Sequence, residues 1–420
     1  MRHDVDPLCD RSNDVALSQN VDGGEMARTS SLSVPKAAGG LRVDCLSKRD
    51  EILDLQDAWH RLEAISQTNT VFQAFDLCMP WLDAYVFGKD PTHEAQVIAL
   101  YQGGELVGLL PLAVPLGSPV VLAEWIGEPL VQYGDMLLDP SCDHVALGKA
   151  LKDAISNLGV DGLLLRAVRA DAAIHDVLPL NAATQAGVAR QAATADLTDF
   201  ETADDYFATF SPKSRKRLRR RRKELAKAGD LGFKVMPAGP DVLGIYDLAL
   251  SWKKAWLADN GLTSRTFMDE RALATLRDAI GRAGKHNPFT AFVQTLNEKP
   301  VAIAIGLVGP QGKAVFLTAY SPEHGALSPG MVQIESTIRF GFESGWPTYD
   351  LMAPLDQYKT SWTNTICDVA DHVVAFTPKA RLYRGIYLST LRPAMKAVWK
   401  AIPAPLRTAA LRLSGGPTEH

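Results

Sequence analysis

The order of predicted strands and helices repeats once along the chain, and this repeat constrains the fold more than any single motif. Each half reads as strand, helix, helix, three strands, helix and strand, with turn residues between the hydrophobic runs. The three consecutive strands are predicted at Ala95–Tyr101, Leu106–Val114 and Val120–Ile126, and again at Phe289–Leu296, Val301–Val308 and Ala314–Ala319. The repeat therefore predicts an α/β (α+β) protein built from two similar domains.

The chain of 420 residues is long enough for two sizeable hydrophobic cores. Residues 1–40 are rich in Ser, Asp, Gly and Ala, lack periodicity and are predicted to form a disordered tail. We place the first domain at 41–200, the second at 201–377, and a basic C-terminal extension at 378–420.

Charge is divided unevenly between the two halves. Residues 1–200 hold 14 Lys and Arg against 28 Asp and Glu, whereas residues 201–420 hold 30 against 20, so a net charge of −4 hides halves of −14 and +10. A basic half predicts an anionic partner, for which coenzyme phosphates, a lipid headgroup surface, a nucleotide-linked sugar and tRNA all qualify.

The sequence favours a cytoplasmic location. The five cysteines include no CxxC pair, which argues against a zinc site or a disulfide framework. No secretory signal is expected in residues 1–40, and prolines interrupt the most apolar stretch, Leu106–Ile126, so that it reads as buried strands.

A dense basic run, from Ser211 to Leu225, opens the second half. On a helix these like charges repel one another unless an anion relieves them. A solvated helix face is the alternative, and the lack of interleaved aromatic residues argues against single-stranded nucleic acid. The candidate anion-binding residues are Lys213, Arg215, Arg217 and Arg220.

A second candidate follows the strand that ends near Tyr320. Ser328 can cap the next helix and Pro329 can occupy its first position. The amides of such a helix start can bind an anion, and Gly330 allows a ligand to approach the backbone closely. A plain capped helix is the alternative. The candidate cofactor-binding residues are Ser328, Gly330, Met331 and Tyr320.

The third candidate spans Tyr349 to Trp362. Asp350 lies in a predicted strand, where a carboxylate needs a partner or a polar cleft, so the alternatives are a catalytic group and an ion pair with Lys359 or an arginine. Lys359 could neutralise the negative charge of a tetrahedral intermediate. Tyr358 and the possible general base His324 complete the catalytic candidates, and Trp362 is a candidate substrate contact.

The C-terminal segment Arg381–Leu413 mixes apolar and basic residues. Such a basic amphipathic helix is typical of contact with an anionic membrane surface, so a location at the inner face of the membrane is possible. A helix docked on its own domain is the alternative.

These motifs, taken in order, resemble a known family. The basic helix, the strand segment Pro300–Ala304, the Ser328–Gly330 helix start, Asp350, and Tyr358 with Lys359 and Trp362 are similar to the BioF2-like acetyltransferase domain of the GNAT superfamily, over about residues 200–376. The family includes CelD-like proteins of cellulose or exopolysaccharide biosynthesis. The first half resembles the degenerate GNAT half that precedes it, and the tandem arrangement is similar to the Fem-type peptidyltransferases.

The resemblance implies two GNAT-like domains, each a mixed and mostly antiparallel sheet flanked by helices. It implies transfer of an acyl group from acyl-CoA, without a metal, to an amine or hydroxyl of an envelope polysaccharide precursor. The alternatives are an amine of a membrane lipid, a Fem-like transfer from aminoacyl-tRNA, and a non-catalytic anion-binding module. The common coenzyme A signature Arg/Gln-x-x-Gly-x-Gly/Ala is absent before Pro329, which leaves acyl-CoA, an acyl carrier protein and a charged tRNA open as donors.

Overall fold

The computed structural model describes residues 40–391, except 69, 70, 182, 261 and 263, together with 394, 395 and 398. The predicted tail lies outside these residues apart from Gly40, and so does most of the predicted C-terminal helix. Its described part is a short helix, Pro378–Leu382 (α13), followed by a π-helix, Tyr383–Leu391.

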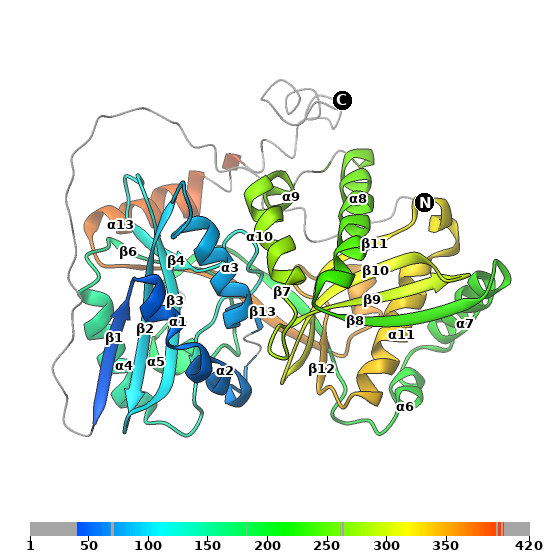
Figure 1. Cartoon of the computed structure of the whole chain (residues 1–420), viewed down its shortest axis with the longest axis horizontal. Helices are drawn as coiled ribbons and strands as arrows, with labels where there is room; N and C mark the ends of the chain where they lie inside the picture. Colours follow the sequence, from blue (N-terminus) through cyan, green and yellow to red (C-terminus); the bar gives the residue numbers. More distant parts are fainter. Residues whose placement is uncertain are drawn as a thin grey trace.

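The described strands form one 13-stranded sheet that runs through both halves (Figure 1). Its order is β1-β2-β3-β4-β6-β13-β7-β12-β11-β10-β9-β8, with β5 paired to β3. The strands are β1 Leu41–Leu46, β2 His93–Gln102, β3 Glu105–Pro115, β4 Leu122–Trp125, β5 Leu137–Leu138, β6 Gly162–Arg169, β7 Gln185–Asp196, β8 Leu231–Pro237, β9 Phe289–Leu296, β10 Lys299–Gly309, β11 Gly312–Tyr320, β12 Thr348–Asp350 and β13 Thr365–Ala375.

Each half contributes one parallel pair, β4 with β6 and β11 with β12, and the other neighbours are antiparallel. The halves also exchange strands. Strand β7 precedes residue 200 but pairs with β12, while β13 comes late in the chain and pairs with β6 and β7. Backbone hydrogen bonds therefore join the halves in the middle of the sheet.

The helices pack on both faces of this sheet (Figure 1), and β2-to-β4 and β9-to-β11 form the meanders that the repeat predicts. The helix predicted from Ser47 is divided into α1 and α2 by a turn at residues 54–55. The helices are α1 Arg49–Leu53, α2 Gln56–Ile65, α3 Phe75–Tyr85, α4 His144–Ser156, α5 Ile174–Val177, α6 Ala203–Ala208, α7 Pro212–Lys227, α8 Leu243–Asp259, α9 Arg265–Met268, α10 Glu270–Gly281, α11 Pro329–Glu343 and α12 Gln357–Thr360, with 3₁₀-helices at Val71–Gln73, Pro240–Val242 and Pro322–Leu327.

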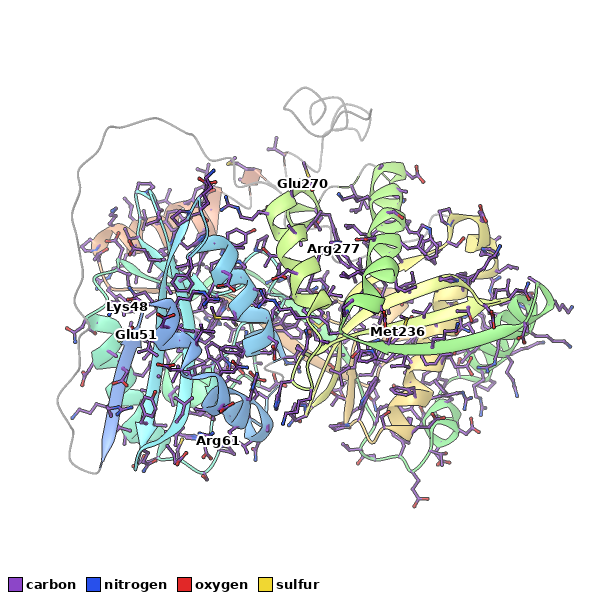
Figure 2. All side chains as sticks on the ribbon, in the orientation of Figure 1. Lys48, Glu51, Arg61, Met236, Glu270 and Arg277 are labelled. Atoms are coloured by element: carbon purple, nitrogen blue, oxygen red, sulfur yellow. The ribbon has the colours of Figure 1, made fainter. Side chains whose placement is uncertain are left out.

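One hydrophobic core continues across the junction of the halves. It includes Phe72 and Trp81 of the first half and Leu307 and Phe316 of the second. Helices α3 and α10 contact each other there, and side chains fill the space between them, with Glu270 and Arg277 labelled on α10 (Figure 2). A second core lies beneath α4 in the first half. The shared core and the shared sheet fix the halves relative to each other, which matters for the site below.

Candidate functional site

Strands β11 and β12 pair over two residues and then separate. The register joins Lys313 to Tyr349 and Ala314 to Asp350. Strand β11 continues to Tyr320, whereas β12 ends at Asp350, after which the Leu351 amide donates to the Ala193 carbonyl on β7 (2.9 Å). The edge of β11 after Ala314 therefore has no strand beside it on the β12 side among the described residues. An open edge of this kind can bind an extended ligand by backbone hydrogen bonds.

Two consecutive residues of the first half lie between the separating strands. The Gln132 side-chain amide donates to the Phe316 carbonyl on β11 (3.1 Å), and the Tyr133 hydroxyl donates to the Asp350 carboxylate at the end of β12 (3.1 Å). Tyr133 is buried against Phe72, which in turn contacts Phe316. We call the gap between the separating strands the opening between β11 and β12. Through Gln132 and Tyr133 the first half contacts both strands that border it.

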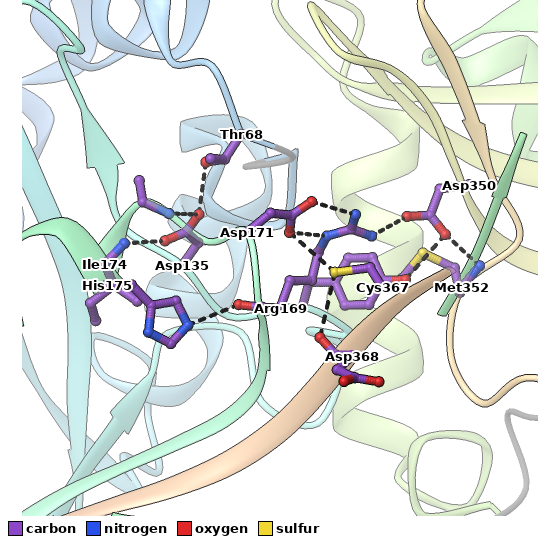
Figure 3. A network of polar contacts seen from close by, with 12 residues as sticks. Thr68, Asp135, Arg169, Asp171, Ile174, His175, Asp350, Met352, Cys367 and Asp368 are labelled. Atoms are coloured by element: carbon purple, nitrogen blue, oxygen red, sulfur yellow. Dashed lines mark hydrogen bonds and ion pairs between the residues drawn. The ribbon is translucent and has the colours of Figure 1, made fainter. Parts of the chain in front are cut away.

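Asp350 is buried and paired with Arg169 of β6 (Figure 3). Its carboxylate accepts from the Arg169 guanidinium (2.7 Å) and the Met352 amide (2.6 Å), as well as from Tyr133. Burial raises the pKa of Asp350, and the neighbouring Arg169 charge opposes that rise. Of the two alternatives for Asp350, the structure shows the arginine ion pair, with an arginine that lies 181 residues away.

Arg169 is itself held from its other side. Its guanidinium makes two bonds to Asp171 (2.8 and 2.9 Å), and its carbonyl lies 3.0 Å from the His175 ring. The Cys367 thiol lies 3.5 Å from Asp171, and burial raises its pKa. The network in Figure 3 therefore connects β6, β12 and β13 at the junction of the halves.

Asp135 anchors the segment that carries Gln132 and Tyr133. Its buried carboxylate accepts from the Thr68 hydroxyl (2.7 Å) and from the amides of Ala173 (3.0 Å) and Ile174 (2.9 Å) at the start of α5. Burial raises the pKa of Asp135 to about 6. These bonds attach the segment to the first half.

Lys359 lies at the open end of β12. Asp356 caps α12 by accepting from the Lys359 amide (2.8 Å), and the Lys359 Nζ donates to the carbonyls of Met352 (2.9 Å) and Pro354 (3.0 Å). Lys359 is buried, whereas its neighbour Tyr358 is exposed. The structure therefore places a fixed amino group beside the strand opening.

Trp362 is in the core rather than on a binding surface. Only 2% of it is exposed, its ring packs against Phe210, and its carbonyl accepts from the Tyr206 hydroxyl (2.7 Å). This corrects the prediction of a substrate contact, because a large aromatic side chain that follows a helix packs inward where a core surface is available.

The connection from β11 to α11 surrounds the other end of the opening. Tyr320 is exposed, and the His324 ring lies 3.0 Å from the Ser321 hydroxyl within the 3₁₀-helix. Pro329 takes the first position of α11 as predicted. Ser328 occupies the predicted N-cap position, but it adopts a left-handed conformation (φ 55°) and its side chain makes no capping hydrogen bond.

The backbone at the start of α11 leaves space beside Gly330. The Met331 amide donates to the Ser328 carbonyl (3.1 Å), so it is already used within the turn. A Cβ added at Gly330 would have no atom within 4 Å. The positive end of a 15-residue helix therefore meets open space there.

The basic helix α7 lies beside this helix start. Its 16 residues include ten Lys or Arg and one Glu, and Leu218 and Leu225 are its buried residues. Arg221 donates to the Ala326 carbonyl (3.3 Å), which ties α7 to the connection before α11. Lys213, Arg217 and Arg220 are exposed, and Arg215 is half-buried.

The parallel pair of the first half does not offer a similar opening. The Trp125 indole donates to the Arg166 carbonyl (2.9 Å), and a Cβ on Gly134 would overlap the indole. Arg166 in turn pairs with Glu124 (2.5 Å) beside these strands. Of the two parallel pairs, β4 with β6 is therefore occupied by side chains of the first half itself.

Sequence reasoning missed Gln132, Tyr133 and Arg169, which no motif marks. It also missed Lys313, a buried lysine of β11 whose Nζ has no hydrogen-bond partner and lies 3.8 Å from the centre of the Phe292 ring. Gly306 makes room for it, because a Cβ there would meet the lysine chain at 2.3 Å. Burial lowers the pKa of Lys313 well below its usual value.

The described residues contain neither a membrane-spanning helix nor a metal-binding cluster. None of their helices is long and apolar enough to cross a membrane. Among them, no group of three or more His, Cys, Asp or Glu residues could hold a metal ion.

Comparison with known proteins supports the fold and matches part of the second half to a known family. Residues 212–360 match the family described as acetyltransferase (GNAT) domain. The crystal structure of FemX is 13% identical, covers 79% of this chain and 98% of its own, and superposes with a TM-score of 0.55. No curated protein matches the chain.

Two further solved structures are similar. A conserved protein of unknown function from Bacteroides thetaiotaomicron is 13% identical, over 79% of this chain and 99% of its own, with a TM-score of 0.48. The C-terminal domain of a putative lysylphosphatidylglycerol synthetase from Agrobacterium fabrum is 14% identical, over 83% and 96%, with a TM-score of 0.48. The prediction of a GNAT-like fold with a mixed, mostly antiparallel sheet is confirmed.

Proposed function

Because residues 212–360 match the acetyltransferase (GNAT) domain family, we propose that this chain is an acyltransferase that uses acyl-CoA as donor. The observation that carries the proposal is the opening between β11 and β12, which leaves the edge of β11 beyond Ala314 without a neighbouring strand, next to the start of α11. The extended pantetheine arm of coenzyme A suits the strand edge, and its diphosphate suits the positive end of α11.

The proposed reaction is direct transfer. An amine or hydroxyl of the acceptor attacks the thioester carbonyl carbon, the carbon–sulfur bond breaks, and the proton of the acceptor passes to water while the sulfur takes up a proton. Lys359 beside the opening would stabilise the negative charge that develops on the carbonyl oxygen. Asp350 holds the junction of the halves through Arg169 and acts as a positioning residue.

The proposed acceptor is an anionic precursor of an envelope polysaccharide. The exposed cations of α7 lie next to the proposed donor site, so a phosphate-bearing acceptor would be attracted there. An amine of a membrane lipid is the second candidate, and the C-terminal segment described below favours it. Transfer from aminoacyl-tRNA and a non-catalytic role are the alternatives that the experiments below distinguish from these.

Gly330→Asp is expected to weaken acetyl-CoA binding by about tenfold or more, because a carboxylate would face the diphosphate. The fold should tolerate it, since the space is open and an acidic residue in the first turn of a helix is favourable. Calorimetric titration with acetyl-CoA and palmitoyl-CoA measures the effect, with the uncharged Gly330→Asn as matched control. Absence of binding to the unmodified chain would exclude coenzyme A as donor, and unchanged binding by Gly330→Asp would place the diphosphate elsewhere. Equal weakening by both variants would assign the loss to the size of the new side chain rather than to its charge.

Lys359→Met is expected to slow acyl transfer by at least about tenfold, with acetyl-CoA affinity changed less than about threefold. Release of the coenzyme A thiol is measured with a nucleotide-linked amino sugar and, separately, with a sphingoid base in vesicles. Lys299→Met, which removes an exposed lysine at the start of β10, is the control. An unchanged rate in Lys359→Met would remove this lysine from the mechanism, and no release with any acceptor would favour the non-catalytic module.

A further inference from the structure

The segment after Pro378 has two apolar faces, and one of them is already covered. Ala380 and Leu388 are buried against Leu164 and Val373 of the sheet, in a small core of their own. Tyr383 and Tyr387 stack on each other (ring centres 5.0 Å apart) at the edge of this core. These contacts fix the segment on the sheet and define which of its side chains face outward.

The outward face carries a stripe of large apolar side chains. The first three recur every four to five residues, a spacing that keeps them on one side of the helical segment that ends with the π-helix Tyr383–Leu391. Each is between 48% and 66% exposed, and none belongs to the covered face. The residues of this outer stripe are Leu382, Ile386, Leu391, Met395 and Val398.

The charge of the surrounding sequence is of one sign. Residues 377–418 contain eight basic residues and no acidic residue. Arg381, next to Leu382, is exposed, and Lys379 pairs with Asp161, the residue before β6 (3.2 Å). The eight are Lys379, Arg381, Arg384, Arg392, Lys396, Lys400, Arg407 and Arg412.

We propose that the outer stripe lies in the headgroup region of an anionic bilayer, to which the exposed Arg381 and the positive charge of the surrounding sequence attract it. An apolar stripe set in cations fits the boundary between acyl chains and anionic headgroups. A second copy of the chain would bring two positive segments together, and a nucleic acid has no counterpart for the apolar stripe. The inference is independent of the proposed acyl transfer, because it concerns a different surface and needs no donor or acceptor.

The test is sedimentation of the full chain with vesicles of phosphatidylcholine alone and with 30% phosphatidylglycerol. We expect binding to the anionic vesicles at least about tenfold tighter than to the neutral ones, and weaker binding as salt is raised. Leu382→Gln with Ile386→Gln should reduce binding to anionic vesicles by about tenfold or more. Val145→Gln is the matched control, since Val145 of α4 is 85% exposed and lies outside the stripe.

Three results would overturn the proposal. They are equal binding to neutral and anionic vesicles, no binding to either, and unchanged binding of the double variant. Sedimentation velocity adds a fourth: a dimer that the double variant dissociates would show that a second copy covers the stripe. Thermal unfolding checks the variants, whose exposed positions should leave the melting temperature nearly unchanged.

Discussion

Arg169→Met is expected to lower the free energy of unfolding by about 3–5 kcal/mol, the largest loss expected from any single substitution considered. The change leaves the buried Asp350 without its cation while Tyr133 and the Met352 amide remain as neutral donors. It also releases the contact that joins β6 of the first half to β12 of the second. Urea unfolding followed by far-ultraviolet circular dichroism measures the loss.

A double variant separates the ion pair from simple loss of packing. Arg169→Met with Asp350→Leu removes both charges, so it should recover most of the stability that the single change loses. Asp171→Asn is the control for the outer side of Arg169, and it should cost less than about 1 kcal/mol because Asp171 is largely exposed. A loss below about 1 kcal/mol in Arg169→Met would mean that water reaches Asp350 and that the pair does not hold the junction.

The sequence predicts the elements of the second half well because each is set locally. Strand β9 has the bounds that its hydrophobic run predicts. The pattern also predicts a helix from Pro329 to Ser344, and α11 starts at Pro329 and ends at Glu343. Here a turn residue or a proline stands at each boundary, so the local sequence is enough. Strand β13 shows the limit of local prediction. The sequence predicts a strand at Val369–Phe376, but β13 starts at Thr365, and it pairs with β6 and β7, which only the assembled sheet decides.

The candidate site is harder to predict because it is made between the halves. Asp350 could be identified as a buried carboxylate in need of a partner, but nothing local distinguishes Arg169 from the other arginines of the chain. Gln132 and Tyr133 lie in a connection whose composition is ordinary, and their role depends on where β11 and β12 separate. Trp362 shows the opposite error, because its place in the motif suggested a surface role that the core packing excludes.

Lys313 was missed for a related reason. It follows Gly312 at the start of β11, directly after a turn, where a lysine normally reaches solvent. In the folded chain its amino group lies instead over Phe292 and near Tyr349, whose hydroxyl also has no hydrogen-bond partner. A buried lysine without a partner opposes folding, because its amino group loses hydration and gains no bond in return.

Lys313→Met is therefore expected to raise the free energy of unfolding at pH 7 by about 2 kcal/mol, since methionine fills a similar volume without an amine to desolvate. Burial holds the pKa of Lys313 in the folded chain below its value in the unfolded chain. Below the unfolded pKa, unfolding therefore takes up a proton, and the lysine lowers the free energy of unfolding more as the pH falls. The advantage of methionine should accordingly be larger at pH 7 than at pH 10, as urea unfolding at the two values can measure. Lys299→Met, at an exposed position, should change stability by less than about 0.5 kcal/mol at both. If Lys313→Met proves less stable than the unmodified chain, the Lys313 amine has a stabilising partner in solution. If Lys313→Met is instead more stable but loses acetyl-CoA binding, the amine serves donor binding at the opening between β11 and β12.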